Sequence, residues 1–221
     1  MEAIKTLIIA RFRILLWLTV SMTLSIVLLM IRMKLNQSIF FMFLVWNLFL
    51  ALIPFTIIMY LSSKKNIPKW SLLLWFGIWL LFLPNAPYII TDLLHLRMSD
   101  KYLMWLDVLV VSSFACNGMI LFFLSLMDME SLLRSFTSVK IRFYLITFVL
   151  FLTAFGIYLG RFLRYNSWEI LQHPYDLFTD ILNIIIQPNQ YVEAWIFSLF
   201  FGIFLSVGFW MFKAFLKIKT N

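Results

Sequence analysis

The chain has 221 residues, of which 63% are hydrophobic and 13% are charged, and its formal net charge is +8. Soluble domains carry about 45–50% apolar and about 25% charged residues, so this composition excludes a soluble globular protein and indicates one that lies mostly in lipid. The basic residues flank apolar runs, where they serve membrane topology, and they therefore give no support to nucleic-acid binding.

One cysteine, Cys116, is present, which excludes an internal disulfide. The first apolar run is followed by Arg32 and Lys34 instead of a small-residue cleavage site, so it is predicted to be an anchor and not a signal peptide. No internal repeat, low-complexity tract or soluble appendage is found. The sequence therefore predicts a single integral membrane domain over residues 1–221.

Six apolar runs are long enough to cross a bilayer as helices. A hydrocarbon core of about 30 Å takes about 20 helical residues. The runs lie near residues 12–31, 38–61, 70–90, 106–127, 143–163 and 192–212. The predicted fold is all-α, a polytopic bundle of about six transmembrane helices in a cell membrane.

The orientation follows from the basic residues, because six spans put both termini on one side. Twelve of the 18 Lys and Arg residues fall on the side of the termini and six on the other. Cytoplasmic loops carry an excess of Lys and Arg, so both termini are predicted to be cytoplasmic. Seven of the ten acidic residues and both histidines, His95 and His173, fall on the outer side. The positive-inside rule does not explain this clustering, so function is expected at the outer face.

The third span contains the run LPNAPY, from Leu83 to Tyr88. Proline lacks the N–H that a helix uses and disfavours helical geometry in the residue before it. The helix is therefore predicted to break at Pro84 to Pro87, with the residue before each proline extended. Freed backbone groups at membrane depth are tolerated only inside protein or beside water, so the break predicts a polar pocket that opens outward. Asn85 and Tyr88 are candidate substrate-binding residues there.

Asp92 and His95 follow the break at a spacing of three, which puts both side chains on one face of a helical turn. A carboxylate beside an imidazole can act as a general base with its orienting acid, so both are candidate catalytic residues. Two other interpretations remain open: the residues are two ligands of a metal ion, or the aspartate caps a re-entrant helix beside an interfacial histidine. The sequence leaves the metal and any cofactor undetermined.

Asp107 lies at the outer mouth of the fourth span, where an ionisable residue is costly unless it has a partner. It is a candidate substrate-binding residue, and we expect it either to pair with an arginine of the fifth span or to reach interfacial water.

The fifth span ends in three more candidate substrate-binding residues, Arg161, Arg164 and Asn166. The two arginines stand three apart, so they are predicted to share one helix face and to grip a carboxylate or phosphate. Alternatively, they pair with aspartates or reach lipid phosphates. Trp168 and Glu169 would complete this rim. Gly156 and Gly160 allow a close helix approach, within the bundle or across a homo-oligomer.

Between the fifth and sixth spans, Pro174 opens a stretch of about a dozen residues that ends at Ile186. Pro suits a first helical position, and Asp176 and Asp180 oppose an apolar face. The stretch is too short to cross a bilayer, so it predicts a helix at the outer interface or a loop helix packed on the bundle.

The run Leu83 to Tyr88 with Thr91-Asp92-Leu93 and His95-Leu96, together with Gly156, Tyr158 to Arg161, Arg164 and Asn166-Ser167-Trp168, resembles a family of bacterial multi-pass membrane proteins. That family is catalogued only as a domain of unknown function, so the resemblance implies membership and no activity. Tyr165 and Glu169 stand where the family pattern has Trp and Asp. His173 has no place in the pattern, and its role stays undetermined.

Three functions remain in competition. The first is an enzyme or binding protein whose outward pocket holds a lipid headgroup or another anionic envelope substrate. The second is a structural or accessory subunit of a membrane complex, in which the same polar residues form an internal ion-pair network. The third is transport, for which six spans are few and no inverted repeat is found. Membrane lipids are expected partners in each case, with a second copy or another membrane protein as a further partner.

Overall fold

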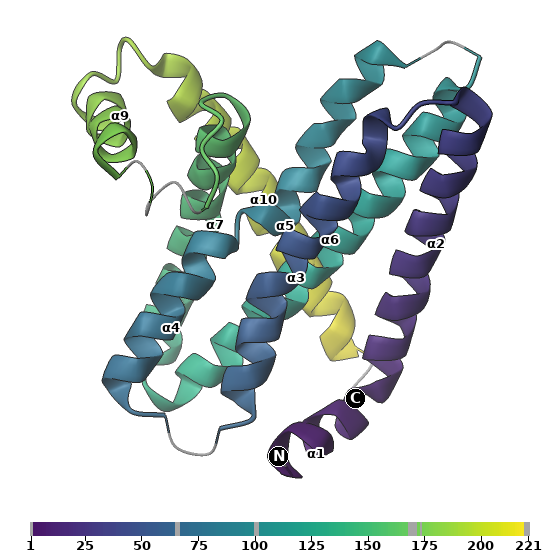
Figure 1. Cartoon of the computed structure of the whole chain (residues 1–221). Helices are drawn as coiled ribbons and strands as arrows, with labels where there is room; N and C mark the ends of the chain where they lie inside the picture. Colours follow the sequence, from purple (N-terminus) through teal and green to yellow (C-terminus); the bar gives the residue numbers. More distant parts are fainter. Residues whose placement is uncertain (1, 65–66, 100–101, 168–171, 173, 219–221) are drawn as a thin grey trace. The chain divides into compact units, whose positions relative to one another are not determined.

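The computed structural model describes residues 2–64, 67–99, 102–167, 172 and 174–218 (Figure 1). Within these ranges the chain consists of helices joined by turns and irregular connections and contains no strand, which confirms the predicted all-α fold. The helices are α1 (Glu2–Ala10), α2 (Phe12–Asn36), α3 (Phe43–Ser62), α4 (Lys69–Phe82), α5 (Asn85–Tyr88), α6 (Met104–Leu132), α7 (Val139–Arg161), α9 (Pro174–Ile186) and α10 (Val192–Ile218). Shorter 3₁₀ segments are η1 (Phe40–Met42), η2 (Ile89–Met98) and η3 (Leu133–Ser135).

The six predicted spans are confirmed. Among the described residues, six helical segments are long and apolar enough to cross a membrane: Phe12–Asn36, Phe40–Ser62, Lys69–Met98, Met104–Ser135, Val139–Arg161 and Val192–Leu216. The predicted helix between the last two is also present, as α9, and it begins at Pro174.

The chain divides into two compact units, residues 1–129 and 130–221, with the boundary inside α6. The prediction of a single membrane domain stays a prediction. In the first unit, α3, α4 and α6 supply fully buried side chains, among them Leu44, Trp79 and Phe114. The indole of Trp79 donates a hydrogen bond to Ser125 Oγ at 2.8 Å, which gives this large buried ring a polar partner in α6.

In the second unit, α7 and α10 pack along each other. Gly202 of α10 lies so close to the ring of Phe151 in α7 that a Cβ at Gly202 would collide with it. The hydroxyl of Ser138 caps the start of α7 by accepting a hydrogen bond from the Ile141 amide. The sequence did not single out Gly202, because its role depends on which helix lies opposite.

The third span is interrupted where the prolines predict it, since α4 ends at Phe82 and α5 begins at Asn85. The expected extended backbone is wrong: Leu83 has φ −57° and ψ −40°, and Ala86 lies within α5. Leu83 is fully buried and its amide donates to Trp79 O at 2.9 Å. Packing and this hydrogen bond outweigh the steric preference that proline imposes on the preceding residue. Pro84 itself sits where a new helical segment begins and needs no N–H donor.

Candidate functional site

Asp92 and His95 lie together on η2, as their spacing predicted. In a 3₁₀ helix side chains three residues apart are aligned, and here Nδ1 of His95 is 3.6 Å from Oδ1 of Asp92. The other carboxylate oxygen, Oδ2, accepts a hydrogen bond from the Asn47 side-chain amide at 2.8 Å. Asp92 is 1% exposed, whereas 29% of the His95 side chain is exposed. A buried, oriented carboxylate therefore faces a partly accessible imidazole.

Aromatic rings line the imidazole of His95. The ring centroids of Phe43 and Phe40 lie 4.9 Å and 6.0 Å from its centroid. Both phenylalanines come from the junction of η1 and α3, whereas Asn47 lies one turn further along α3. The start of α3 thus fixes both members of the pair, which the sequence did not indicate because α3 is far from η2 along the chain.

The interrupted segment satisfies several of its own backbone groups. The Asn85 side chain donates to Phe82 O at 2.9 Å, the Ala86 amide to Leu83 O at 3.2 Å, and the Tyr88 amide to Pro84 O at 3.0 Å. These bonds remove part of the reason for expecting a water-filled pocket at the break. The substrate-binding roles of Asn85 and Tyr88 stay predictions.

Gly118 of α6 lies against this segment. A Cβ at Gly118 would collide with the carbonyl oxygen of Ala86 and would also crowd Ile89 at 3.1 Å. The absence of a side chain at Gly118 therefore lets α6 approach the backbone of α5 closely, just before the η2 segment that carries Asp92.

Asp107 has a partner that the sequence reasoning did not foresee. Nε of Arg32, in α2, lies 2.7 Å from Oδ1 of Asp107, and its Nη2 lies 3.4 Å from Oδ2. Arg32 also donates to Ser38 O at 3.1 Å and stacks over the Phe41 ring at 4.6 Å. Asp107 is 0% exposed and Arg32 is 4% exposed. The expectation that Asp107 reaches interfacial water is wrong, because the α2 guanidinium covers it.

A second ion pair joins the opposite ends of the same two helices. Arg11, which precedes α2, donates to both oxygens of Asp128 in α6, and the Nη2–Oδ1 distance is 2.7 Å. The hydrogen bond to Asp128 raises the pKa of Arg11 above its usual value, against the opposing effect of burial. Between the two ion pairs, the side-chain amide of Asn117 donates to Ser25 Oγ at 2.9 Å.

The spacing of these contacts is regular. Arg11 and Arg32 are 21 residues apart, and so are Asp107 and Asp128. At 1.5 Å per residue this corresponds to about 31 Å of helix, close to the thickness of a hydrocarbon core. The antiparallel helices α2 and α6, side by side in Figure 1, are thus joined by charged pairs at two levels one bilayer core apart. The equal spacing was the sequence signal that could have revealed the pairing.

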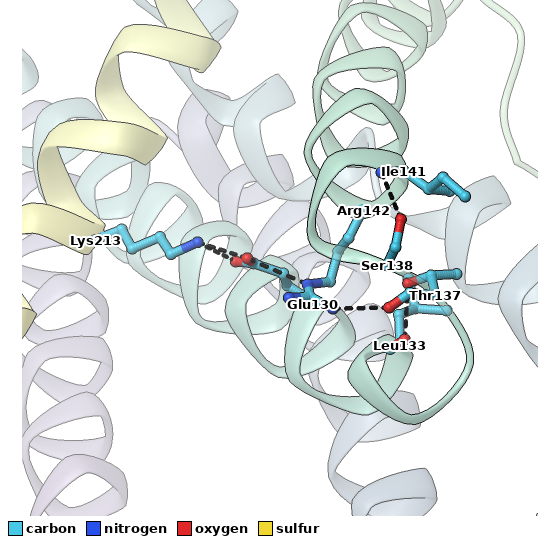
Figure 2. A network of polar contacts seen from close by, with 7 residues as sticks. All are labelled: Glu130, Leu133, Thr137, Ser138, Ile141, Arg142 and Lys213. Carbon is cyan, nitrogen blue, oxygen red and sulfur yellow. Dashed lines mark hydrogen bonds and ion pairs between the residues drawn. The ribbon is translucent and has the colours of Figure 1, made fainter.

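The second unit contains a further charged cluster, centred on Glu130 (Figure 2). Nζ of Lys213 donates to both carboxylate oxygens at 2.6 Å, and Arg142 Nε lies 3.7 Å from Oε1. Arg142 also donates to Thr137 O at 3.2 Å. The three charged side chains are only 11–13% exposed. This cluster connects the last turn of α6 with the beginning of α7 and the end of α10.

Arg161 and Arg164 do not share a helix face, so that prediction is wrong. Arg161 is the last residue of α7, and Arg164 lies beyond it with a left-handed φ of 63°. The turn brings the Tyr165 amide to Leu159 O at 3.1 Å. Arg164 and Asn166 are exposed, whereas Arg161 is half-buried. Trp168, Glu169 and His173 lie outside the described residues.

No group of three or more His, Cys, Asp or Glu side chains that could hold a metal ion occurs in the described part of the chain. The pair of Asp92 and His95 supplies two such side chains. The metal interpretation therefore has no third protein ligand of these types from the described residues.

The family model described as "Protein of unknown function (DUF1361)" matches residues 46–207. The chain belongs to this family. No curated protein and no solved structure matches the chain.

The DUF1361 region contains every candidate site residue named from the sequence. Asp128 lies in the same region, but Arg32 and Arg11, the cationic partners of Asp107 and Asp128, precede it. Lys213, which binds Glu130, follows it. The predicted membership of a family of unknown function is confirmed, and the specific motifs and the bacterial origin stay predictions.

Proposed function

We propose that this multi-pass membrane protein acts on the polar headgroup of an anionic amphiphile in the cell envelope, with Asp92 and His95 as the proton-transfer pair. The observation that carries the proposal is the nearly complete burial of Asp92, 3.6 Å from a histidine whose side chain is 29% exposed. The hydrogen bond from Asn47 fixes the carboxylate. A separation of 3.6 Å exceeds a hydrogen bond, and such distances commonly shorten when a substrate binds.

In this proposal Asp92 orients the imidazole through Nδ1 and favours the tautomer with a proton there. Nε2 then serves as the general base towards a hydroxyl or water. The rings of Phe40 and Phe43 limit water around the imidazole and offer an apolar wall for an amphiphile. The proposal keeps the cytoplasmic termini expected from the distribution of Lys and Arg, and with that topology the pair would lie towards the outer face.

An anionic substrate is proposed from charge. Arg161, Arg164 and Asn166 belong to the second unit and are the candidate anion-binding residues of that unit taken by itself. Asn85, Tyr88 and Asp107 are the other proposed substrate-binding positions. Since Asp107 is fully buried by Arg32, its contribution to a substrate would be indirect.

Two measurements test this function: the headgroup composition of the envelope amphiphiles and the tautomer of the His95 imidazole. Cells producing the wild type, Asp92→Asn or His95→Gln are compared by mass spectrometry of their envelope amphiphiles. Asp180→Asn is the matched control, because it makes the same carboxylate-to-amide change at a residue that accepts a hydrogen bond from Tyr165. We expect a change in headgroup composition that requires Asp92 and His95 and persists in Asp180→Asn.

The tautomer of His95 is read separately by nitrogen NMR of histidine-labelled protein. The chain has two histidines, so His173→Gln leaves His95 as the single signal. We expect a dominant Nδ1–H tautomer that becomes mixed in Asp92→Asn. If folded His95→Gln protein produces the same amphiphiles as the wild type, the proton-transfer function is wrong.

A structural role in a membrane complex is the second candidate, and the contacts between α2 and α6 favour it. Arg32 and Asp107 form a buried ion pair, and half-buried Arg11 forms another with buried Asp128. Exchanging Arg32 and Asp107 should then retain folding, whereas either single change should not. In a purely structural protein, Asp92→Asn would alter stability without altering any amphiphile.

A further inference from the structure

α9 has three distinct faces along its 13 residues. One face packs inward through the buried side chains of Leu177 and Ile184. At 3.6 residues per turn, a second arc of about 100° next to it carries apolar side chains that remain exposed: Tyr175, Phe178, Leu182, Ile185 and Ile186. The remaining arc carries Asp176, Thr179 and Asn183. A helix packed on protein and surrounded by water elsewhere would not need this apolar arc.

The apolar arc is strongly exposed, since its members range from 53% for Phe178 and Ile185 to 80% for Tyr175. These residues recur three or four positions apart, which aligns them along the length of α9. They form an uninterrupted apolar stripe, and a contiguous exposed apolar surface marks contact with a membrane or with another protein.

Contacts with α10 and with the segment after α7 hold α9 at the ends of these two spans. The Trp195 indole, in the first turn of α10, donates to Ile184 O at 3.1 Å. Ile184 packs with Tyr158 of α7 and Ala194 of α10. The Tyr165 hydroxyl, shortly after α7, donates to Asp180 at 2.8 Å. Because α7 and α10 are candidate spans, these contacts fix α9 at the level of a membrane surface.

We propose that α9 lies at a boundary of three phases, with its inner face on the protein, its polar arc towards water and its apolar stripe among the acyl chains of one leaflet. The 13 residues span about 20 Å, which is too short to cross a hydrocarbon core of about 30 Å. Helices with a charged face and an apolar face of this kind bury the latter at the boundary between headgroups and acyl chains.

The exposed surface of the neighbouring span α10 indicates that lipid, and not another protein, covers the apolar stripe of α9. Exposed apolar residues continue along α10 at helical spacing, with Trp195, Ile196, Leu199 and Phe200 each between 48% and 66% exposed. Trp195 therefore connects α9 to a surface that must face lipid if α10 crosses the membrane, and Trp is enriched at this depth. The proposal does not depend on the function assigned to Asp92 and His95.

Spin labels at two positions on α9, one on the apolar stripe and one on the polar arc, test whether the stripe lies in lipid. Cys116 is exposed and is replaced in a Cys116→Ser background, so that a single introduced cysteine takes the nitroxide. Leu182→Cys labels the apolar stripe and Asp176→Cys labels the polar arc. Both proteins are placed in phospholipid nanodiscs, and collisions with oxygen, which concentrates in lipid, are compared with collisions with a water-soluble nickel chelate.

We expect oxygen to dominate at position 182 and the nickel chelate to dominate at position 176, with a several-fold difference in their ratio. Unchanged thermal melting of the labelled proteins verifies folding, which exposed positions should preserve. Equal access of the nickel chelate to both labels would show that the stripe faces water. Strong coupling between labels at position 182 of different molecules would show that a second copy covers the stripe. Either result overturns the proposal.

Discussion

Asp92 and Asp107 are both almost completely buried in the first unit, yet they have different kinds of partner. Asp107 is bound through both oxygens by the guanidinium of Arg32. Asp92 accepts a hydrogen bond from the neutral amide of Asn47 and faces the imidazole of His95. A guanidinium keeps its proton at any physiological pH, whereas an imidazole gains and loses one. Burial alone therefore does not identify a candidate for proton transfer, and the proposed role of Asp92 depends on the chemistry of its partner.

The largest expected effect is the loss of stability in Asp107→Asn. This change leaves the buried guanidinium of Arg32 without its counter-charge, and breaking a buried pair costs about 3–5 kcal/mol. In Asp92→Asn the new side chain can still accept the hydrogen bond from Asn47, so we expect a loss of about 1 kcal/mol. The free energy of unfolding is measured by detergent titration in mixed micelles. Equal losses in the two variants would remove the distinction between a structural and a functional carboxylate.

Removing both charges of the Arg32–Asp107 pair separates the cost of an unpaired charge from the contribution of the pair itself. The double variant Arg32→Met with Asp107→Leu replaces the ion pair by apolar side chains, and such replacements are often neutral or stabilising. We expect it to recover most of the stability lost in Asp107→Asn, as measured in the same titration. An equally unstable double variant would indicate that Arg32 acts through its bond to Ser38 O and its contact with Phe41 instead.

The sequence predicted the architecture well because membrane spans depend on a local property. Runs of about 20 apolar residues identify a span whatever its neighbours are, and α9 was located from its length and its initial proline. The pairing of Asp92 with His95 was likewise accessible, because three residues of helix bring the two side chains together. These features require no knowledge of which helices are adjacent.

The features that the sequence missed depend on contacts between distant segments. Asn47 and Phe43 of α3 and Phe40 of η1 contact Asp92 or His95. Arg32 reaches Asp107 across 75 residues. The equal spacing of 21 residues between the two arginines and between the two aspartates was the sequence signal for this pairing, and it becomes meaningful only once α2 and α6 are known to be neighbours. The steric rule for residues before proline also failed at Leu83, because it describes a local preference that burial and a hydrogen bond can exceed.

A smaller effect is expected where α6 supports the segment that leads to Asp92. In Gly118→Ala the new Cβ meets the backbone carbonyl oxygen of Ala86, so the segment must shift, at a cost of about 1–3 kcal/mol. Gly77→Ala is the matched control, because nothing lies within 4 Å of a Cβ there. Alanine favours a helix over glycine by up to about 1 kcal/mol, so the control should be neutral or stabilising.

If Gly118→Ala shifts η2 as well as α5, it should also change the His95 tautomer measured by nitrogen NMR, whereas Gly77→Ala should not. A destabilised Gly118→Ala protein with an unchanged tautomer would separate the packing of α5 from the geometry of the candidate site.

The smallest effect is expected at Arg164, the candidate anion-binding residue with a left-handed backbone. That conformation costs a side-chain-bearing residue about 1–2 kcal/mol, and glycine avoids this cost but loses about 0.5–1 kcal/mol of entropy on folding. Arg164→Gly should therefore be slightly more stable than Arg164→Ala, which keeps the strain and removes the same charge. If Arg164 binds an anionic amphiphile, both variants should lose retention on anionic vesicles equally, despite their difference in stability. Retention that follows stability instead would mean that the conformation of the turn matters and the guanidinium does not, so Arg164 would have a structural role.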